Sequence, residues 1–208
     1  LVSSSPSQLM ASAAVITVLF TSSLGGYVFA RLRFPGRSLV FYFILSTSMV
    51  PFITLLIPLY IVIKNLGMLN SLMGLWVPAM FSSFCIFLCR QFILSIPADL
   101  YEAAKIDGCS DFAIYRIILL PLIRPVMSAL AIFVFLGSFN AFLWPLVVLN
   151  DEQLLTLPVM LSRMANRFGG TDYQAVMAGS VLVSLPPLII FLTFQRNFVQ
   201  GITLTGLK

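Results

Sequence analysis

Charged residues divide the chain into long uncharged stretches separated by short polar segments. Five stretches hold no Asp, Glu, Lys or Arg: residues 1–30, 38–63, 65–89, 126–150 and 173–195. Each exceeds the roughly 20 residues that a helix needs to cross about 30 Å of hydrocarbon. Because backbone polar groups in lipid must be satisfied within the protein, each crossing should be helical. The pattern predicts an all-α, polytopic membrane helix bundle with five transmembrane helices.

Proline and small residues inside these stretches bear on how the helices pack. The prolines are Pro51, Pro58, Pro78, Pro145, Pro186 and Pro187. Within a bundle neighbours can satisfy the freed carbonyls, so we expect kinks rather than chain reversals. A gated path could use such kinks, and packing alone would account for them equally well. The small residues Gly25, Gly26, Ala30, Gly137 and Gly179 would let helices approach closely. We find no internal repeat and predict a single transmembrane domain over residues 1–208.

The basic residues outside the uncharged stretches indicate the orientation. Nine lie on one predicted side of the membrane: Arg31, Arg33, Arg37, Arg90, Lys105, Arg116, Arg124, Arg196 and Lys208. Three lie on the other side: Lys64, Arg163 and Arg167. Cytoplasmic loops carry the excess of Lys and Arg, so the first group and the C-terminus should be cytoplasmic. An odd number of spans beginning at Leu1, which is not a methionine, suggests a sixth helix upstream in the full-length subunit.

Composition excludes several classes of function. Of 208 residues 60% are hydrophobic and only 9% are charged, and mean hydropathy is +1.04, whereas soluble domains carry about 25% charged residues. The scattered basic residues form no stripe that could follow nucleic acid. Histidine is absent, which removes the usual general base and the commonest metal ligand. We therefore expect no catalytic residue, no metal site and no enzyme activity.

The segment of residues 90–125 is the one long polar link. Pro97 suits the first turn of a helix, and Gly108 is placed to end that helix at the C′ position. Ser110 or Asp111 can then cap a second short helix. The segment is predicted to hold two short helices outside the membrane.

The first of these helices should need a surface to lie on. It spans only about ten residues, fewer than an isolated helix needs in water. Leu100, Ala103, Ala104 and Asp107 share one side at i, i+3, i+4 and i+7 spacing. Such a ridge could dock into a groove of another protein, or the helix could be a solvated connector that rests on its own bundle.

The same segment resembles a known motif. Glu102-Ala103-Ala104, Gly108, Ile118, Leu120 and Pro121 have the spacing EAA-x3-G-x9-I-x-L-P, which is similar to the signature of binding-protein-dependent ABC importer permeases. GYVFARLRFPG at 26–36, MVPFITLLIPLY at 49–60 and QRNFVQGITLTGLK at 195–208 resemble the carbohydrate-uptake branch. The pattern is similar to the second permease subunit of maltose-type transporters.

This resemblance implies that residues 98–121 form a cytoplasmic coupling segment seated in a cleft of an ATPase subunit. The residues that it assigns to coupling are Glu102, Ala103, Ala104, Asp107, Gly108, Ile118, Leu120 and Pro121. Glu102 could pair with a cation across the interface or with Lys105 at i+3. Gly108 permits a backbone angle or a close approach that a side chain would prevent.

The implied function is that of a permease subunit of an ATP-driven ABC importer for a sugar or oligosaccharide. Its implied partners are an ATPase subunit dimer, a second permease subunit, an extracytoplasmic solute-binding protein and the lipid of a prokaryotic inner membrane. No G-x-x-x-x-G-K-[ST] motif is present, so we expect ATP on the partner and no cofactor on this chain.

The alternative is a stand-alone secondary transporter or channel. Such proteins generally place ionisable groups at mid-membrane depth, and the uncharged stretches have none. A purely structural scaffold is a third reading, and it leaves the isolated polar helix unexplained.

The fourth uncharged stretch ends in aromatic residues that could line a substrate path. Phe135, Phe139, Asn140 and Trp144 precede Pro145. Aromatic faces suit the C–H faces of sugars, and an amide suits their hydroxyls. The alternative is ordinary aromatic packing, with Asn140 hydrogen-bonded between helices.

The outer loop of residues 150–172 is polar. Its polar and glycine residues are Asp151, Glu152, Arg163, Arg167, Gly169 and Gly170. By resemblance the loop would meet the solute-binding protein, and its apolar Leu154, Leu157, Val159 and Met160 could lie along the membrane interface. Cys85 and Cys89 are expected to be small buried hydrophobes.

Overall fold

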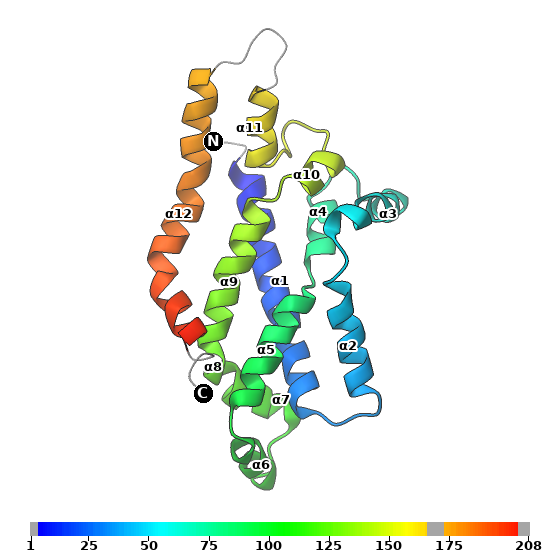
Figure 1. Ribbon diagram of the computed structural model, residues 1–208, viewed down its shortest axis with the longest axis vertical. Coiled ribbons are helices and arrows are strands. Elements are labelled where there is room, and N and C mark those ends of the chain that lie inside the picture. Colours follow the sequence, from blue (N-terminus) through cyan, green and yellow to red (C-terminus); the bar gives the residue numbers. More distant parts are fainter. Residues whose placement is uncertain (1–3, 166–172, 204–208) are drawn as a thin grey trace. The chain divides into compact units, whose positions relative to one another are not determined.

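The computed structural model describes residues 4–165 and 173–203, which form helices and no strands (Figure 1). The first half contains α1 (Ser4–Arg31), α2 (Arg37–Thr47), α3 (Phe52–Asn65), α4 (Leu72–Ala79) and α5 (Ser83–Ser95). The polar link contains α6 (Ala98–Ile106), α7 (Asp111–Ala113), the π-helix η1 (Ile114–Leu119) and α8 (Leu120–Leu122). The remainder contains α9 (Arg124–Phe139), α10 (Leu143–Val148), α11 (Leu157–Ala165) and α12 (Tyr173–Thr203). The all-α prediction is confirmed.

Helices long and apolar enough to cross a membrane overlap the predicted spans, although their bounds differ. Within the described residues three qualify by themselves: Pro6–Arg31, Leu72–Ser95 and Val176–Thr193. Two bent pairs raise the number to five if each pair is one span: Arg37–Thr47 with Phe52–Asn65, and Asp111–Leu122 with Arg124–Phe139. The pairs are bent by 98° and 76°.

The bends are sharper than the kinks that the prolines predict. Pro51 stands at the N-cap of α3, directly after the break that follows α2. Since proline disfavours the helical conformation of the residue before it, the helix stops there instead of bending gently. Pro145 lies in the first turn of α10, where proline is tolerated. The predicted fourth span, 126–150, is therefore two helices, because α9 ends at Phe139.

The chain divides into two compact units, each assembled from separate stretches of sequence. One comprises residues 1–16, 51–80 and 132–194, and the other comprises 17–50, 81–131 and 195–208. Helices α1 and α9 each contribute residues to both units. The single domain predicted over 1–208 stays a prediction, and each unit is described by itself below.

The core of the first unit is built from helices far apart in sequence. It comprises Met10, Ile63, Leu75, Trp144, Val148, Leu149, Leu155 and Val159, with Leu154 packed against it. The prediction for the loop of residues 150–172 is thus partly wrong, because α11 forms within it. Val159 is buried in the core instead of lying at the membrane interface. Arg167 and the Gly169-Gly170 pair lie outside the described residues.

The second unit contains the close helix approach that the glycines predict. A Cβ at Gly26 would lie 2.6 Å from the Cβ of Cys89 and 2.9 Å from the backbone nitrogen of Arg90. Cys85 and Cys89 are buried and free, as expected of small hydrophobes. In the first unit Gly137 has no such role, because a Cβ there would meet nothing within 4 Å.

Candidate functional site

The short helix α6 ends in a motif that requires glycine. The backbone N–H of Cys109 donates to the carbonyl of Ala104 at 2.9 Å, and that of Gly108 donates to Lys105 at 3.1 Å. This is the Schellman arrangement, with Gly108 at C′ in the left-handed conformation. Its φ is +81°, and a Cβ would meet nothing within 4 Å. Of the two predicted roles of Gly108, the structure supports the backbone angle, and close approach by a partner stays a prediction.

The predicted ridge on α6 divides between an inward and an outward side. Ala104 is 5% exposed and packs within this chain, while Ala103 and Asp107 are exposed. Leu100 is 48% exposed and Ile106 86%. The connector interpretation is therefore confirmed for Ala104, which rests on its own chain, while docking of the exposed side of α6 into another protein stays a prediction.

The residues after Gly108 return the chain to the next long helix. Ser110 is the N-cap of α7, and its hydroxyl accepts from the N–H of Ala113 at 3.2 Å. The π-helix then buries Ile114, Tyr115 and Leu119. Ile118, Leu120 and Pro121, the last residues of the EAA motif, are half-buried beside them. Phe112 and Ile117 remain 64% and 70% exposed, which adds apolar surface near α6.

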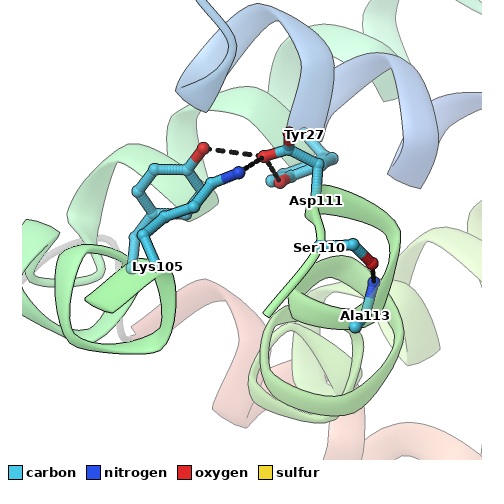
Figure 2. A network of polar contacts seen from close by, with 6 residues as sticks. Tyr27, Lys105, Ser110, Asp111 and Ala113 are labelled. Carbon is cyan, nitrogen blue, oxygen red and sulfur yellow. Dashed lines mark hydrogen bonds and ion pairs between the residues drawn. The ribbon is translucent and has the colours of Figure 1, made fainter. Parts of the chain in front are cut away.

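One carboxylate oxygen joins three elements (Figure 2). Asp111 Oδ1 accepts from the hydroxyl of Tyr101 at 2.8 Å and from the hydroxyl of Tyr27 at 3.2 Å. It also pairs with Lys105 Nζ at 2.9 Å. Because Lys105 is engaged by Asp111, the alternative of a local Glu102–Lys105 pair is wrong. The alternative of Asp111 as helix cap is also wrong, since Ser110 supplies that cap.

Lys105 and Asp111, which lie in the polar link outside the uncharged stretches, have pKa values shifted in opposite directions. The hydrogen bond from Lys105, followed by that from Tyr101, lowers the pKa of Asp111. The hydrogen bond to Asp111 raises the pKa of Lys105. Both shifts favour the charged forms, so the pair is ionised at neutral pH.

A second contact ties the same region to α1. The hydroxyls of Ser23 and Tyr115 share a buried hydrogen bond of 2.8 Å. The rings of Tyr27 and Tyr115 lie 5.6 Å apart, centroid to centroid. The sequence analysis missed Tyr27, Tyr101 and Tyr115, because nothing in their spacing relates residues 27 and 111.

Beside the network, Glu102 lines a polar cavity of about 680 Å³. Arg31, Arg33 and Arg37, the basic residues that follow the first predicted span, line the same cavity. Glu102 itself is exposed. Its carboxylate is accordingly accessible to a cation from outside this chain.

Of the four residues predicted for a substrate path, one lines the apolar cavity of the first unit. That cavity, of about 490 Å³, is lined by Met10, Phe52, Leu75, Pro78, Ala79, Gly137, Ser138, Ala141, Phe142, Leu143 and Trp144. Phe139 is 0% exposed and stacks on Phe135 with centroids 5.6 Å apart, which is ordinary aromatic packing. Asn140 is exposed and does not line this cavity.

The indole of Trp144 is already engaged. Its Nε1–H donates to the carbonyl of Gly74 at 3.0 Å, so the ring can offer a face but not this donor. The sequence analysis missed Met10 and Phe52, because the fold brings them from other helices. Among the described residues no group of three or more His, Cys, Asp or Glu could hold a metal ion.

Helices long and apolar enough to cross a membrane indicate a membrane protein, and comparison with known proteins identifies its family. A family model described as "Binding-protein-dependent transport system inner membrane component" matches residues 8–204. The chain is 38% identical over 193 residues to the arabinooligosaccharides transport system permease protein AraQ of Bacillus subtilis. That match covers 93% of this chain and 68% of the relative.

Two further relatives and one solved structure agree. The lactose transport system permease protein LacG of Rhizobium radiobacter is 38% identical, covering 88% of this chain and 67% of the relative. The sn-glycerol-3-phosphate transport system permease protein UgpE of Salmonella typhi is 39% identical, covering 93% and 69%. The fold is similar to the crystal structure of a bacterial ABC transporter involved in the import of the acidic polysaccharide alginate. The TM-score is 0.83 at 23% identity, covering 95% of this chain and 74% of that one.

The chain belongs to the family of binding-protein-dependent transport system inner membrane components. It is a multi-pass inner membrane permease of an ABC importer, and its relatives are transport permeases rather than enzymes. Membership implies an ATPase and a substrate-binding protein as partners. The stand-alone transporter or channel is not favoured.

Proposed function

We propose that this chain imports a sugar or oligosaccharide as one of two permease subunits that share a translocation path. The proposal is supported by relatives named for arabinooligosaccharides, lactose and sn-glycerol-3-phosphate. Two of these solutes are saccharides, and the third is a phosphorylated polyol. All three are rich in hydroxyls, and the first two offer C–H faces that suit aromatic rings.

The observation that carries the coupling role is the exposed side of α6. Leu100 and Ile106 are 48% and 86% exposed on a helix of nine residues. A helix that short does not persist without packing, and a partner surface would cover these side chains. We assign that surface to a cleft in one subunit of an ATPase dimer. Ala103, Asp107 and Gly108 would lie at the contact, and Glu102 would face a cation of the partner.

The segments after α6 would hold this helix in register with the membrane helices. Ile118, Leu120 and Pro121 are half-buried at the turn back towards α9. Ala104, which is buried in this chain, would set how closely α6 lies against its own subunit. These four residues therefore support the docking surface instead of forming it.

The orientation follows from the charge bias and is part of the proposal. With α6 and the C-terminus in the cytoplasm, the exposed Asp151 and Glu152 face the extracytoplasmic side. There they would meet the solute-binding protein. No group on this chain binds ATP in this proposal, since the nucleotide sits on the ATPase.

The mechanism is alternating access. Closure of the ATPase dimer on ATP would displace α6, and the bent helix pairs would carry that displacement to the path. Partner binding must favour the outward-facing state by several kcal/mol to shift the population. The apolar cavity beside Trp144, Phe52 and Phe142 would contribute one wall of the path.

Replacement of Gly108 tests the coupling role. In the full-length protein assembled with its ATPase and binding protein, Gly108→Asp should lower uptake by roughly tenfold. A non-glycine residue in the left-handed conformation costs about 1–2 kcal/mol, and the added charge lies at the docking surface. Membrane insertion and ATP hydrolysis by the partner should persist, and transport is measured as labelled solute taken into vesicles.

Gly67 supplies a matched control. It closes α3 by the same motif, with Met68 donating to Ile63 and Gly67 to Lys64, both at 3.0 Å. Its φ is +69°, and a Cβ would meet nothing within 4 Å. Gly67→Asp should therefore carry the same strain without loss of coupling. Uptake that survives Gly108→Asp as well as Gly67→Asp would refute the docking role.

A further inference from the structure

We propose that Asp111 is a positioning residue whose carboxylate fastens α6 to α1, so that displacement of α6 reaches the first membrane-crossing helix. The inference rests on the proposed function of α6 as the element that meets the ATPase. It adds the connection through which that element acts on the rest of its own unit.

The three donors come from two elements and meet on one atom. Tyr101 and Lys105 are four residues apart, so they project from one side of α6. Both reach Asp111 Oδ1, at 2.8 and 2.9 Å. The hydroxyl of Tyr27, from α1, reaches the same oxygen at 3.2 Å. Asp111 is the first residue of α7, and its carboxylate therefore connects α6, α7 and α1 (Figure 2).

Apolar packing alone holds α6 weakly. Ala104 is the one buried residue given for this helix, and a single methyl group buries little surface. Hydrogen bonds to an ionised acceptor are roughly twice as strong as bonds between neutral groups. The contacts from Tyr101 and Lys105 to Asp111 therefore add substantially to the attachment of α6 to the described part of its own unit.

A second pair of residues repeats the contact one helical turn away. Ser23 and Tyr27 lie four residues apart on α1, and Asp111 and Tyr115 lie four apart in the facing segment. Asp111 accepts from Tyr27, and Tyr115 shares a 2.8 Å hydrogen bond with Ser23. Two contacts one turn apart resist rotation as well as separation, so the segment from Asp111 to Tyr115 should move with α1.

The rival interpretation is a surface ion pair of little consequence. Lys105 and Asp111 are 39% and 44% exposed, and exposed ion pairs contribute little by themselves. Tyr27 separates the two interpretations because only 2% of it is exposed. Loss of its acceptor would leave a buried hydroxyl unsatisfied, which is costly. Tyr27→Phe removes this buried contact and leaves the exposed ion pair in place, so the informative substitution is at Tyr27 rather than at the ion pair.

The test uses the full-length permease reconstituted with its ATPase, partner permease and solute-loaded binding protein. Tyr27→Phe removes the α1 contact and leaves Lys105, Tyr101 and the docking surface intact. Asp111→Ala removes all three contacts, Asp111→Glu retains the charge, and Tyr42→Phe removes a hydroxyl from an exposed side chain of α2. The measurements are retention of the ATPase on purification, ATP hydrolysis, and solute imported per ATP.

We expect Tyr27→Phe and Asp111→Ala to retain the ATPase and its hydrolysis while solute imported per ATP falls by roughly tenfold, the scale of one lost hydrogen bond to a charged group. Asp111→Glu should recover part of the loss, and Tyr42→Phe should match the parent protein. Tyr27→Phe combined with Asp111→Ala should be no worse than Asp111→Ala alone.

Three results would overturn the inference. They are normal import per ATP in Tyr27→Phe, fully additive losses in the double variant, and release of the ATPase by Asp111→Ala, which would make Asp111 an interface residue. Failure of the underlying proposal is a separate result, because Gly108→Asp would then also import normally. If the Asp111 and Tyr27 variants couple normally while Gly108→Asp loses coupling, the positioning role is refuted and the docking role of α6 is not.

Discussion

At the scale of the residue, Asn70 shows how one side chain can join two segments distant in sequence. Its φ is +52°, the one positive value given for a residue other than glycine in the described chain. Its Oδ1 accepts from the backbone N–H groups of Asn150 and Asp151, at 3.0 and 2.8 Å. Its own N–H donates to Val148 at 2.9 Å. Asparagine tolerates this conformation better than most residues, and its amide oxygen supplies the acceptor.

The thermal stability of variants at Asn70 should therefore depend on the hydrogen bonds that each substitution removes and the backbone strain that it adds. Asn70→Gly keeps the backbone conformation and loses two hydrogen bonds, at about 0.5–1.5 kcal/mol each. Asn70→Ala loses the same bonds and adds about 1–2 kcal/mol of backbone strain, so it should unfold at the lowest temperature. Asn70→Asp keeps an acceptor and should unfold last of the three. Thermal unfolding in detergent measures the order, and an alanine variant more stable than the glycine variant would contradict it.

At the scale of the element, two neighbouring glycines of α1 contribute unequally to its spacing from α5. A Cβ at Gly26 would overlap the Cβ of Cys89, at 2.6 Å, and the backbone of Arg90. A Cβ at Gly25 would meet the side chain of Ile86 at 3.4 Å, an ordinary contact. The backbone of α5 cannot yield as a flexible side chain can. Helix separation is therefore set at Gly26.

Alanine at these two positions should have unequal effects. Gly26→Ala should lower the free energy of unfolding by about 1–3 kcal/mol, the usual cost of overpacking. Gly25→Ala should change it by less than about 1 kcal/mol, because alanine favours the helix and no atom must move. The two variants can be compared by thermal unfolding at equal detergent concentration. Equal midpoints would show that α5 shifts away without cost.

At the scale of the whole molecule, the proposed orientation places α6 and the exposed Asp151 loop on opposite faces of the membrane. Cysteine chemistry can test this, because Cys109 is partly exposed and free while Cys85 and Cys89 are buried. Cys109 follows Gly108 directly at the end of α6. Its accessibility thus reports the side on which the coupling segment lies.

An impermeant thiol reagent should label Cys109 in inside-out vesicles and not in intact cells with a permeable outer envelope. Cys109→Ser should abolish the signal. Gln153→Cys, placed in the exposed loop on the Cys109→Ser background, should show the opposite sidedness. Labelling of Cys109 from outside would invert the proposed orientation, and mass spectrometry of the labelled peptide identifies the modified residue.

Sequence by itself determined the features that depend on neighbouring residues. The apolar stretches and the Gly108 helix end involve groups within a few positions of one another, so periodicity and spacing reveal them, and the cap of the next helix was narrowed to Ser110 or Asp111. The EAA spacing together with the three further segments at 26–36, 49–60 and 195–208 was likewise sufficient to indicate the family, because each is a local pattern. For the same reason the segment around α6 was recognisable as two short helices before any packing was known.

The tertiary structure alone decided which groups meet. Lys105 had Glu102 one turn away, yet it pairs with Asp111, because the turn at Gly108 folds α7 back towards α6. Tyr27 joins the same carboxylate from 84 positions earlier in the chain, and Met10, Phe52 and Trp144 meet at one cavity. The burial of Val159 was likewise decided by the tertiary structure. Each depends on which helix packs against which, and the apolar pattern of a membrane helix looks alike on all its faces.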